Sequence, residues 1–140
     1  MRALGATAAL LGVFSAGFLG GIEIAVGAFV LLCGLAVALY AGVEGGGLLA
    51  AQLAVFGSVC WRAVFPPLVG YLRWDDAARY TTTRWTHLYL GPEGELTRGI
   101  ELGLIYGVLA AVVLGSAAYG VGALYRFLRR DDPSTHPYVE

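Results

Sequence analysis

The 140-residue sequence has few charged side chains and contains neither lysine nor asparagine. Charged residues make up 14% of the chain, whereas a soluble globular domain has roughly 25%. Together with the 58% of hydrophobic residues, this composition indicates a protein whose solvent is lipid. The net charge of −1 offers no basic surface for nucleic acid, so we expect no nucleic-acid partner.

The sequence also lacks the motifs that carry catalysis or bind metals. It has no Gly-x-Ser-x-Gly, no P-loop and no HExxH. Cys33 and Cys60 lie in apolar runs without CxxC spacing, which favours two small buried side chains over a redox pair. His87 and His136 have no Cys, Asp or Glu at metal-site spacing, and ligation of a haem or chlorophyll by His87 stays open as an alternative. We therefore expect no metal site and no catalytic residue, and the sequence identifies no cofactor.

Long apolar runs divide the chain into four predicted membrane spans. Residues 3–43 contain one charge, Glu23, and are about twice as long as the roughly 20 residues that cross a bilayer core. Because paired glycines favour a turn, we divide this run at Gly20 and Gly21. The four spans predicted in this way cover residues 3–18, 24–43, 48–72 and 98–124.

The third span contains Pro66 and Pro67, which remove two backbone donors from the helix. Two alternatives follow. The helix either ends near Val64, with residues 68–72 in the membrane interface, or it kinks and continues to Leu72. Both alternatives place the following loop on the same side of the membrane.

A polar loop over residues 73–97 separates the third and fourth spans. Within it, Gly91 to Glu95 predict a turn. Aromatic residues in and beside this loop predict a belt at the level of the lipid headgroups, formed by Trp61, Tyr71, Trp74, Tyr80, Trp85 and Tyr89. Residues 131–140 contain two prolines and predict a flexible tail.

Four spans place both termini on one side of the membrane. The arginines do not decide which side, because the two sets are equal: Arg2, Arg126, Arg129 and Arg130 against Arg73, Arg79, Arg84 and Arg98. The tight cluster of three arginines beside the last span favours cytoplasmic termini. We accordingly expect a multi-pass protein of a prokaryotic cell membrane.

The last span carries a face of small residues at i+4 spacing, formed by Gly99, Gly103, Gly107, Ala111 and Gly115. Small residues at this spacing let a second helix approach closely in lipid. We therefore expect this face, a candidate glycine zipper, to pack against another helix. For Gln52, the only amide in a span, we expect a hydrogen bond between helices.

Three charged residues fall inside or at the edge of predicted spans, namely Glu23, Arg62 and Glu101. A charge at the centre of a membrane helix costs roughly 2.5–3.5 kcal/mol on insertion scales. All three lie toward the side of the polar loop. They predict either a cluster that holds a ligand, relays protons or binds an ion, or interfacial side chains that snorkel and pair to fix the packing. Glu101 points nearly opposite the small-residue face, so the last helix is expected to make two contacts.

Residues 96–104 are similar to an Arg-Gly-Leu-Glu-Val-Gly stretch that opens a span in the photosystem I subunit L family. The rest of the chain shows no further match, so no family membership follows.

The sequence predicts an all-α fold, a polytopic membrane helical bundle of about four transmembrane helices with one polar interfacial loop.

The favoured functional hypothesis is a non-catalytic structural or accessory subunit of a membrane complex, or a homo-oligomer. Its partners are the lipid bilayer and other membrane subunits or copies of itself. The alternative is a small transporter or channel that uses the cluster of Glu23, Arg62 and Glu101. A membrane enzyme has no supporting motif.

The predicted topology can be tested with single cysteines introduced at Thr82 and Ser134. Four spans place these residues on opposite sides, so an impermeant thiol reagent should label only one of them in sealed vesicles. Labelling of both from the same side would contradict four spans.

Overall fold

The computed structural model describes residues 2–21, 26–73 and 91–130, which are almost entirely helical and contain no strand in these ranges. The helices in chain order are α1 (Arg2–Leu19), α2 (Val26–Glu44), α3 (Leu48–Leu72), α6 (Gly91–Ala110), η2 (Ala111–Gly115) and α7 (Ser116–Arg130). The last three form one continuous helix with a π turn inside it. The predicted all-α fold is confirmed.

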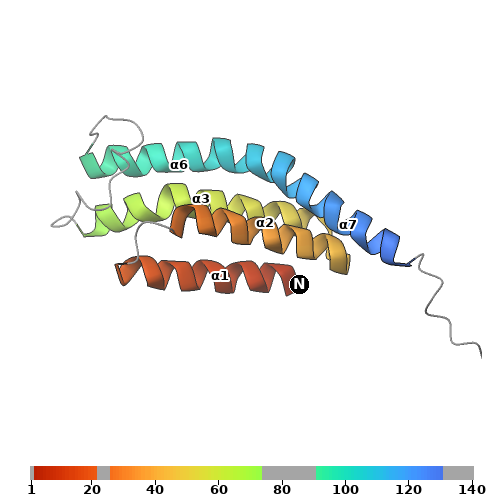
Figure 1. Cartoon of the computed structure of the whole chain (residues 1–140). Coiled ribbons are helices and arrows are strands. Elements are labelled where there is room, and N and C mark those ends of the chain that lie inside the picture. The colour runs from red at the N-terminus through yellow and green to blue at the C-terminus, as the bar shows by residue number, and fades with distance from the viewer. Residues whose placement is uncertain (1, 22–25, 74–90, 131–140) are drawn as a thin grey trace, which may run out of the picture.

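Length and composition suit this bundle to a membrane. Three of the described helices are long and apolar enough to cross one: α1, α3 and the helix from Gly91 to Arg129, while α2 contributes a shorter apolar helix. Consecutive helices run in opposite directions, so the beginning of α1 and the end of α7 lie at the same end of the bundle (Figure 1). We call this the terminal end and the opposite one the loop end.

The buried core of the bundle consists of small side chains. Alanines and valines of α2 and α3 form most of it, namely Val37, Ala38, Ala41, Ala50, Ala51, Ala54 and Val55. At the same interface, a methyl group on Gly34 would lie 3.0 Å from Ser58 Cβ. The hydroxyl of Ser58 donates to the Ala54 carbonyl in its own helix, at 2.9 Å. The buried serine is thus satisfied locally, and α2 and α3 pack almost backbone to backbone.

Helices α2 and α7 cross at a pair of glycines that the sequence analysis did not single out. A methyl group on Gly122 would lie 2.9 Å from the Val43 nitrogen and collide with the Leu39 carbonyl. A methyl group on Gly42 would lie 3.0 Å from Gly122 Cα and collide with the Tyr119 carbonyl. No side chain fits at either position, so this crossing depends on both glycines.

Helix α3 runs through Pro66 and Pro67 to Leu72, which decides between the two sequence-based alternatives in favour of the longer helix. Because Pro67 has no N–H, the carbonyl of Ala63 loses its helical donor. Gly99 of α6 lies against that carbonyl, because a methyl group on Gly99 would stand only 2.5 Å from the Ala63 oxygen. A Cα–H of Gly99 therefore points at this oxygen. A neighbouring helix thus compensates for the proline, as membrane helices commonly allow.

The last helix begins at Gly91, seven residues before the predicted start at residue 98, so the predicted turn over 91–95 is wrong. The local residues explain this result. Gly91 has a φ of 73°, Pro92 takes the next position, and Glu93 lies in the first turn. Proline at the first helical position and an acidic residue near the helix N-terminus both favour a helix start. Residues 74–90 of the predicted loop lie outside the described residues.

The π turn at Ala111–Gly115 keeps the small-residue face directed at α3. Residues four apart advance about 400° in an α-helix, so an i+4 face drifts by about 40° at each step. A π turn holds more residues per turn and so counteracts this drift. Ala111 and Gly115 are both buried, and a methyl group on Gly115 would lie 3.0 Å from Gln52 Cα.

The crossing of α2 and α7 can be tested with two neighbouring glycines of α7. Gly122→Ala should lower the unfolding free energy by about 1–3 kcal/mol, because its methyl group meets backbone atoms. The control is Gly120→Ala, since a Cβ there meets no atom within 4 Å and alanine favours the helix. Unfolding in detergent micelles measures both variants. Equal losses of stability would show that α2 and α7 do not pack this closely.

Candidate functional site

The small-residue face of the last helix is covered by α3 of the same chain. Gly99, Gly103, Gly107, Ala111 and Gly115 are all buried. A methyl group on Gly103 would lie 3.2 Å from Val64 Cγ2, and one on Gly107 would lie 3.1 Å from Cys60 Sγ. The contact that these residues make is therefore within the bundle.

Two polar side chains reinforce this interface. Cys60 Sγ donates to the Gly103 carbonyl at 3.2 Å. Gln52 Nε2 donates to Ser116 Oγ at 3.1 Å, which confirms the hydrogen bond between helices that was predicted for Gln52. Both bonds connect α3 to the last helix, one at Gly103 and one at Ser116, just after Gly115.

Glu95 belongs to the same face, and the sequence analysis missed it. Its side chain is 1% exposed, and it is the one buried charged residue within the described ranges. The signal is present in the sequence, because Glu95 lies four residues before Gly99 and so extends the small-residue face by one step. The predicted turn over 91–95 concealed this periodicity. Burial of a carboxylate is costly unless polar groups surround it.

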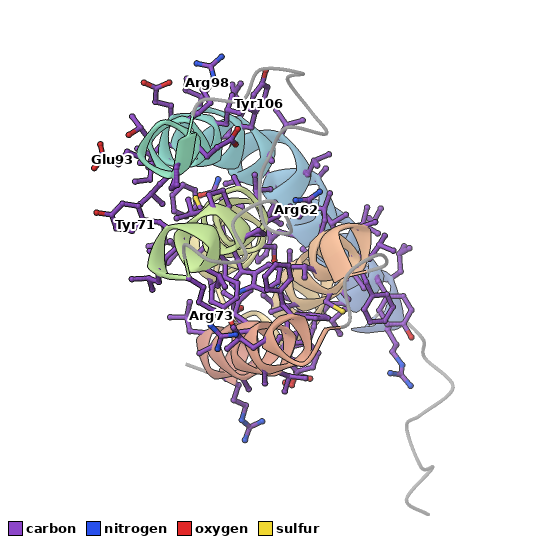
Figure 2. The ribbon with its side chains drawn as sticks, turned by 90° about the vertical axis from the view of Figure 1, so that its left-hand side faces the viewer. Arg62, Tyr71, Arg73, Glu93, Arg98 and Tyr106 are labelled. Atoms are coloured by element: carbon purple, nitrogen blue, oxygen red, sulfur yellow. The ribbon has the colours of Figure 1, made fainter. Side chains whose placement is uncertain are left out.

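Two of the three charges predicted inside or at the edge of spans, Arg62 and Glu101, lie in different surroundings. Glu101 Oε2 accepts from Arg98 Nη1 at 3.0 Å, and the two side chains are 53% and 49% exposed. Arg98 points outward from α6, whereas Arg62 is half-buried on α3, nearer the middle of the bundle (Figure 2). Glu23 lies outside the described residues. The structure thus joins Glu101 to its own helix and places that pair on the outer surface.

Trp61 packs inside the bundle rather than in an outward belt. Its ring stacks on Phe65 with centroids 5.0 Å apart, and Phe18 of α1 meets it edge-on at 6.3 Å. Its Nε1 donates to Ser15 Oγ at 2.8 Å. Trp61 therefore holds α1 against α3, whereas Tyr71 at the end of α3 is 43% exposed. The other predicted belt residues lie outside the described residues, namely Trp74, Tyr80, Trp85 and Tyr89.

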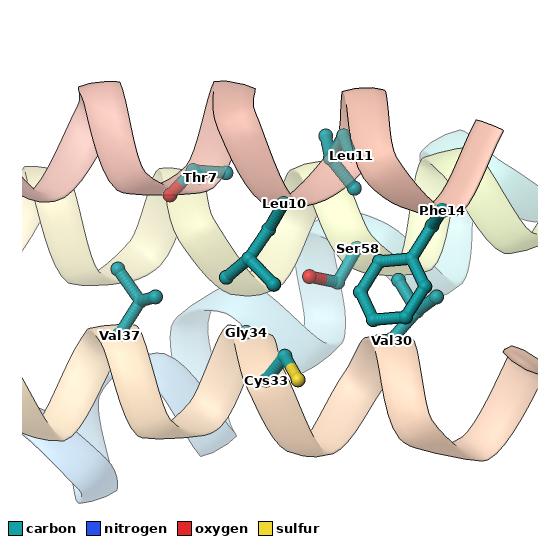
Figure 3. A pocket seen from close by; sticks show the side chains of 9 residues that line it. All are labelled: Thr7, Leu10, Leu11, Phe14, Val30, Cys33, Gly34, Val37 and Ser58. Atoms are coloured by element: carbon teal, nitrogen blue, oxygen red, sulfur yellow. The ribbon is translucent and has the colours of Figure 1, made fainter. Parts of the chain in front are cut away.

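A small cavity lies where α1, α2 and α3 meet (Figure 3). Most of its lining is apolar, and two hydroxyl groups, those of Thr7 and Ser58, donate to carbonyls of their own helices. Its volume is about 10 Å³, which is the space that one water molecule needs. This cavity cannot take a cofactor or a substrate.

Comparison with known proteins identifies no relative of this chain. The chain matches no protein-family model, no curated protein and no solved structure. Within the part of the chain that the structure describes, no three His, Cys, Asp or Glu residues group as metal ligands would.

The hydrogen bond between Gln52 and Ser116 can be measured with a double-mutant cycle. Gln52→Leu and Ser116→Ala should each destabilise the bundle, with a coupling energy of about 0.6 kcal/mol, as is typical for hydrogen bonds between membrane helices. Unfolding of the four proteins in mixed micelles provides the cycle. Additive losses, with no coupling, would contradict the contact between α3 and α7.

Proposed function

We propose that this chain is a non-catalytic structural or accessory subunit of a membrane assembly, formed with other subunits or with copies of itself. The observation that carries the proposal is a contrast between two outward faces of the bundle, one on α6 and one on α1.

The outward face of α6 and η2 is bulky. Its exposed side chains include Ile100, Leu104, Ile105, Val108, Leu109, Val112 and Val113. Long branched side chains of this kind fill the surface of a helix and suit contact with lipid tails. This face needs no protein partner.

On the outward face of α1, one stripe of small residues runs beside the exposed Val13. Gly5 and Gly12 have no heavy atom within 4 Å of a built Cβ. Ala8 and Ala16 are exposed as well, and Ala8, Gly12 and Ala16 follow one another at i+4 spacing. Only Ala3 of this helix is buried. The outer side of α1 therefore has the small-xxx-small pattern of helix contacts, and none of the described helices covers it.

The rest of the bundle shows how such a face is used. On α6, the small-residue face meets α3. On α7, Gly122 meets Gly42 of α2. By the same physics, a second membrane helix on the outer face of α1 gains close backbone contact that lipid tails do not supply. This reasoning supports assembly through α1.

We further propose that the protein lies in a prokaryotic cell membrane with cytoplasmic termini. Arg126 and Arg129 lie at the terminal end, and clusters of arginine beside a span favour the cytoplasmic side. The prokaryotic origin rests on composition alone, since nine arginines without lysine or asparagine are typical of GC-rich genomes.

Assembly through α1 predicts that Gly12→Leu releases the partner. The leucine side chain would cover the small-residue stripe of α1, and its Cβ would meet no described atom within 4 Å, so the fold should keep its stability. Val108→Leu is the control, because it enlarges a face that is already bulky. Native mass spectrometry after mild extraction from native membranes should show a complex for wild type and the control, and a monomer for Gly12→Leu.

Two outcomes would overturn the proposal. One is a wild-type protein that leaves its native membrane as a lone monomer. The other is an equal effect of Gly12→Leu and Val108→Leu. An absorption spectrum of the same preparation reports any coloured cofactor that co-purifies.

A further inference from the structure

A second, larger pocket lies at the terminal end of the bundle, between the first residues of α1 and the last turn of α2. Its floor is made by Ala3 and Ala41, which are 5% and 1% exposed. Its walls carry the side chains of Arg2, Tyr40 and Glu44. The pocket exists because the helices meet through alanine there, while long polar side chains stand around the contact.

The pocket is large enough for a chemical group bigger than water. Its volume is about 150 Å³, whereas one water molecule needs roughly 10–15 Å³ by the same measure. It is also open to the surroundings of the bundle, since Arg2, Tyr40 and Glu44 are exposed. The cavity of Figure 3, by contrast, has a volume of about 10 Å³.

The position of the pocket determines which molecules reach it. Arg2 begins α1 and Glu44 ends α2, so both charges stand where an apolar helix terminates. In a bilayer, such positions lie at the level of the lipid headgroups. Tyr40 suits the same level, because tyrosine has an apolar ring and a polar hydroxyl.

The charges of the pocket are opposite in sign and yet separate. Arg2 and Glu44 line the same space, and no ion pair joins them in the described structure. A guanidinium group binds phosphate with paired hydrogen bonds, and a carboxylate accepts hydrogen bonds from a primary ammonium. A group that carries both charges, a short distance apart, can satisfy both walls at once.

We propose that this pocket binds a phosphoethanolamine headgroup, with the lipid phosphate on Arg2 and the primary ammonium on Glu44. Tyr40 also lines the pocket, and its hydroxyl is a further donor for the phosphate. A phosphatidylglycerol headgroup supplies no cation for Glu44. A phosphatidylcholine headgroup supplies a cation whose nitrogen carries no hydrogen to donate.

Basic side chains at the terminal end favour phosphate without selecting a headgroup. The guanidinium of Arg126 lies against Gly45, in the turn that follows α2, and Arg129 is exposed on α7. These arginines attract every phospholipid phosphate at the terminal end. The selectivity for ethanolamine rests on Glu44.

The proposal can be tested by lipid retention. The full-length protein is exchanged into mixed micelles that hold equal amounts of phosphatidylethanolamine, phosphatidylcholine and phosphatidylglycerol with identical acyl chains. Native mass spectrometry then counts the lipids that remain bound. Wild type should retain phosphatidylethanolamine preferentially, and Glu44→Gln should lower this preference about tenfold, since the loss of one charged hydrogen bond is enough for the roughly 1.4 kcal/mol that a tenfold change represents.

Further variants separate the two charges. Arg2→Gln should weaken retention of all three lipids, because each carries the phosphate. Arg98→Gln is the matched control, since Arg98 is exposed at the loop end and pairs with Glu101. A wild-type protein that retains the three lipids equally, or prefers phosphatidylglycerol, overturns the proposal. So does an unchanged preference in a Glu44→Gln variant whose thermal unfolding matches wild type.

Discussion

Close contact between helix backbones is the constraint on which this bundle depends. Lipid tails are as apolar as leucine, so burial of apolar side chains does not by itself hold helices together in a membrane. Dispersion between closely packed atoms remains, and it requires short distances. Gly42 and Gly122 permit that distance between α2 and α7, and Gly99, Gly103 and Gly107 permit it between α3 and α6. Both interfaces involve the last helix, which packs against α3 through α6 and against α2 through α7.

The sequence predicted the helical membrane bundle because hydrophobic length is a strong signal that survives any arrangement of the helices. It also located the small-residue face, since i+4 periodicity depends on one helix alone. It could not say which helix covers that face. The crossing of Gly42 and Gly122 was missed for a related reason, because a contact between two single glycines far apart in the chain leaves no local pattern. The sequence likewise could not decide whether the prolines end the third helix or leave it continuous, because the group that compensates for Pro67 is Gly99 on another helix.

The polar residues show how a local partner can displace a distant one. The sequence placed Glu101 on the same side of the membrane as Arg62. Their similar depth in the membrane kept a cluster of the two side chains as a hypothesis. Arg98 lies three residues from Glu101 on the same helix surface, and this pair needs no tertiary contact. The reverse holds for Glu95, whose burial became visible only when the helix was seen to start at Gly91. A helix start shifted by seven residues therefore changed which carboxylate is the buried one.

The π turn at Ala111–Gly115 gives the last helix two independent rotational settings. On its N-terminal side the helix is set by α3, and on its C-terminal side by α2, where Arg126 reaches the turn at Gly45. Loss of a single residue from the π turn would rotate everything beyond it by about 100° around the helix axis. Gly122 would then leave Gly42, and Arg126 would turn away from α2. Chain length inside this short segment, rather than the identity of its side chains, sets where the positive charge of the terminal end points.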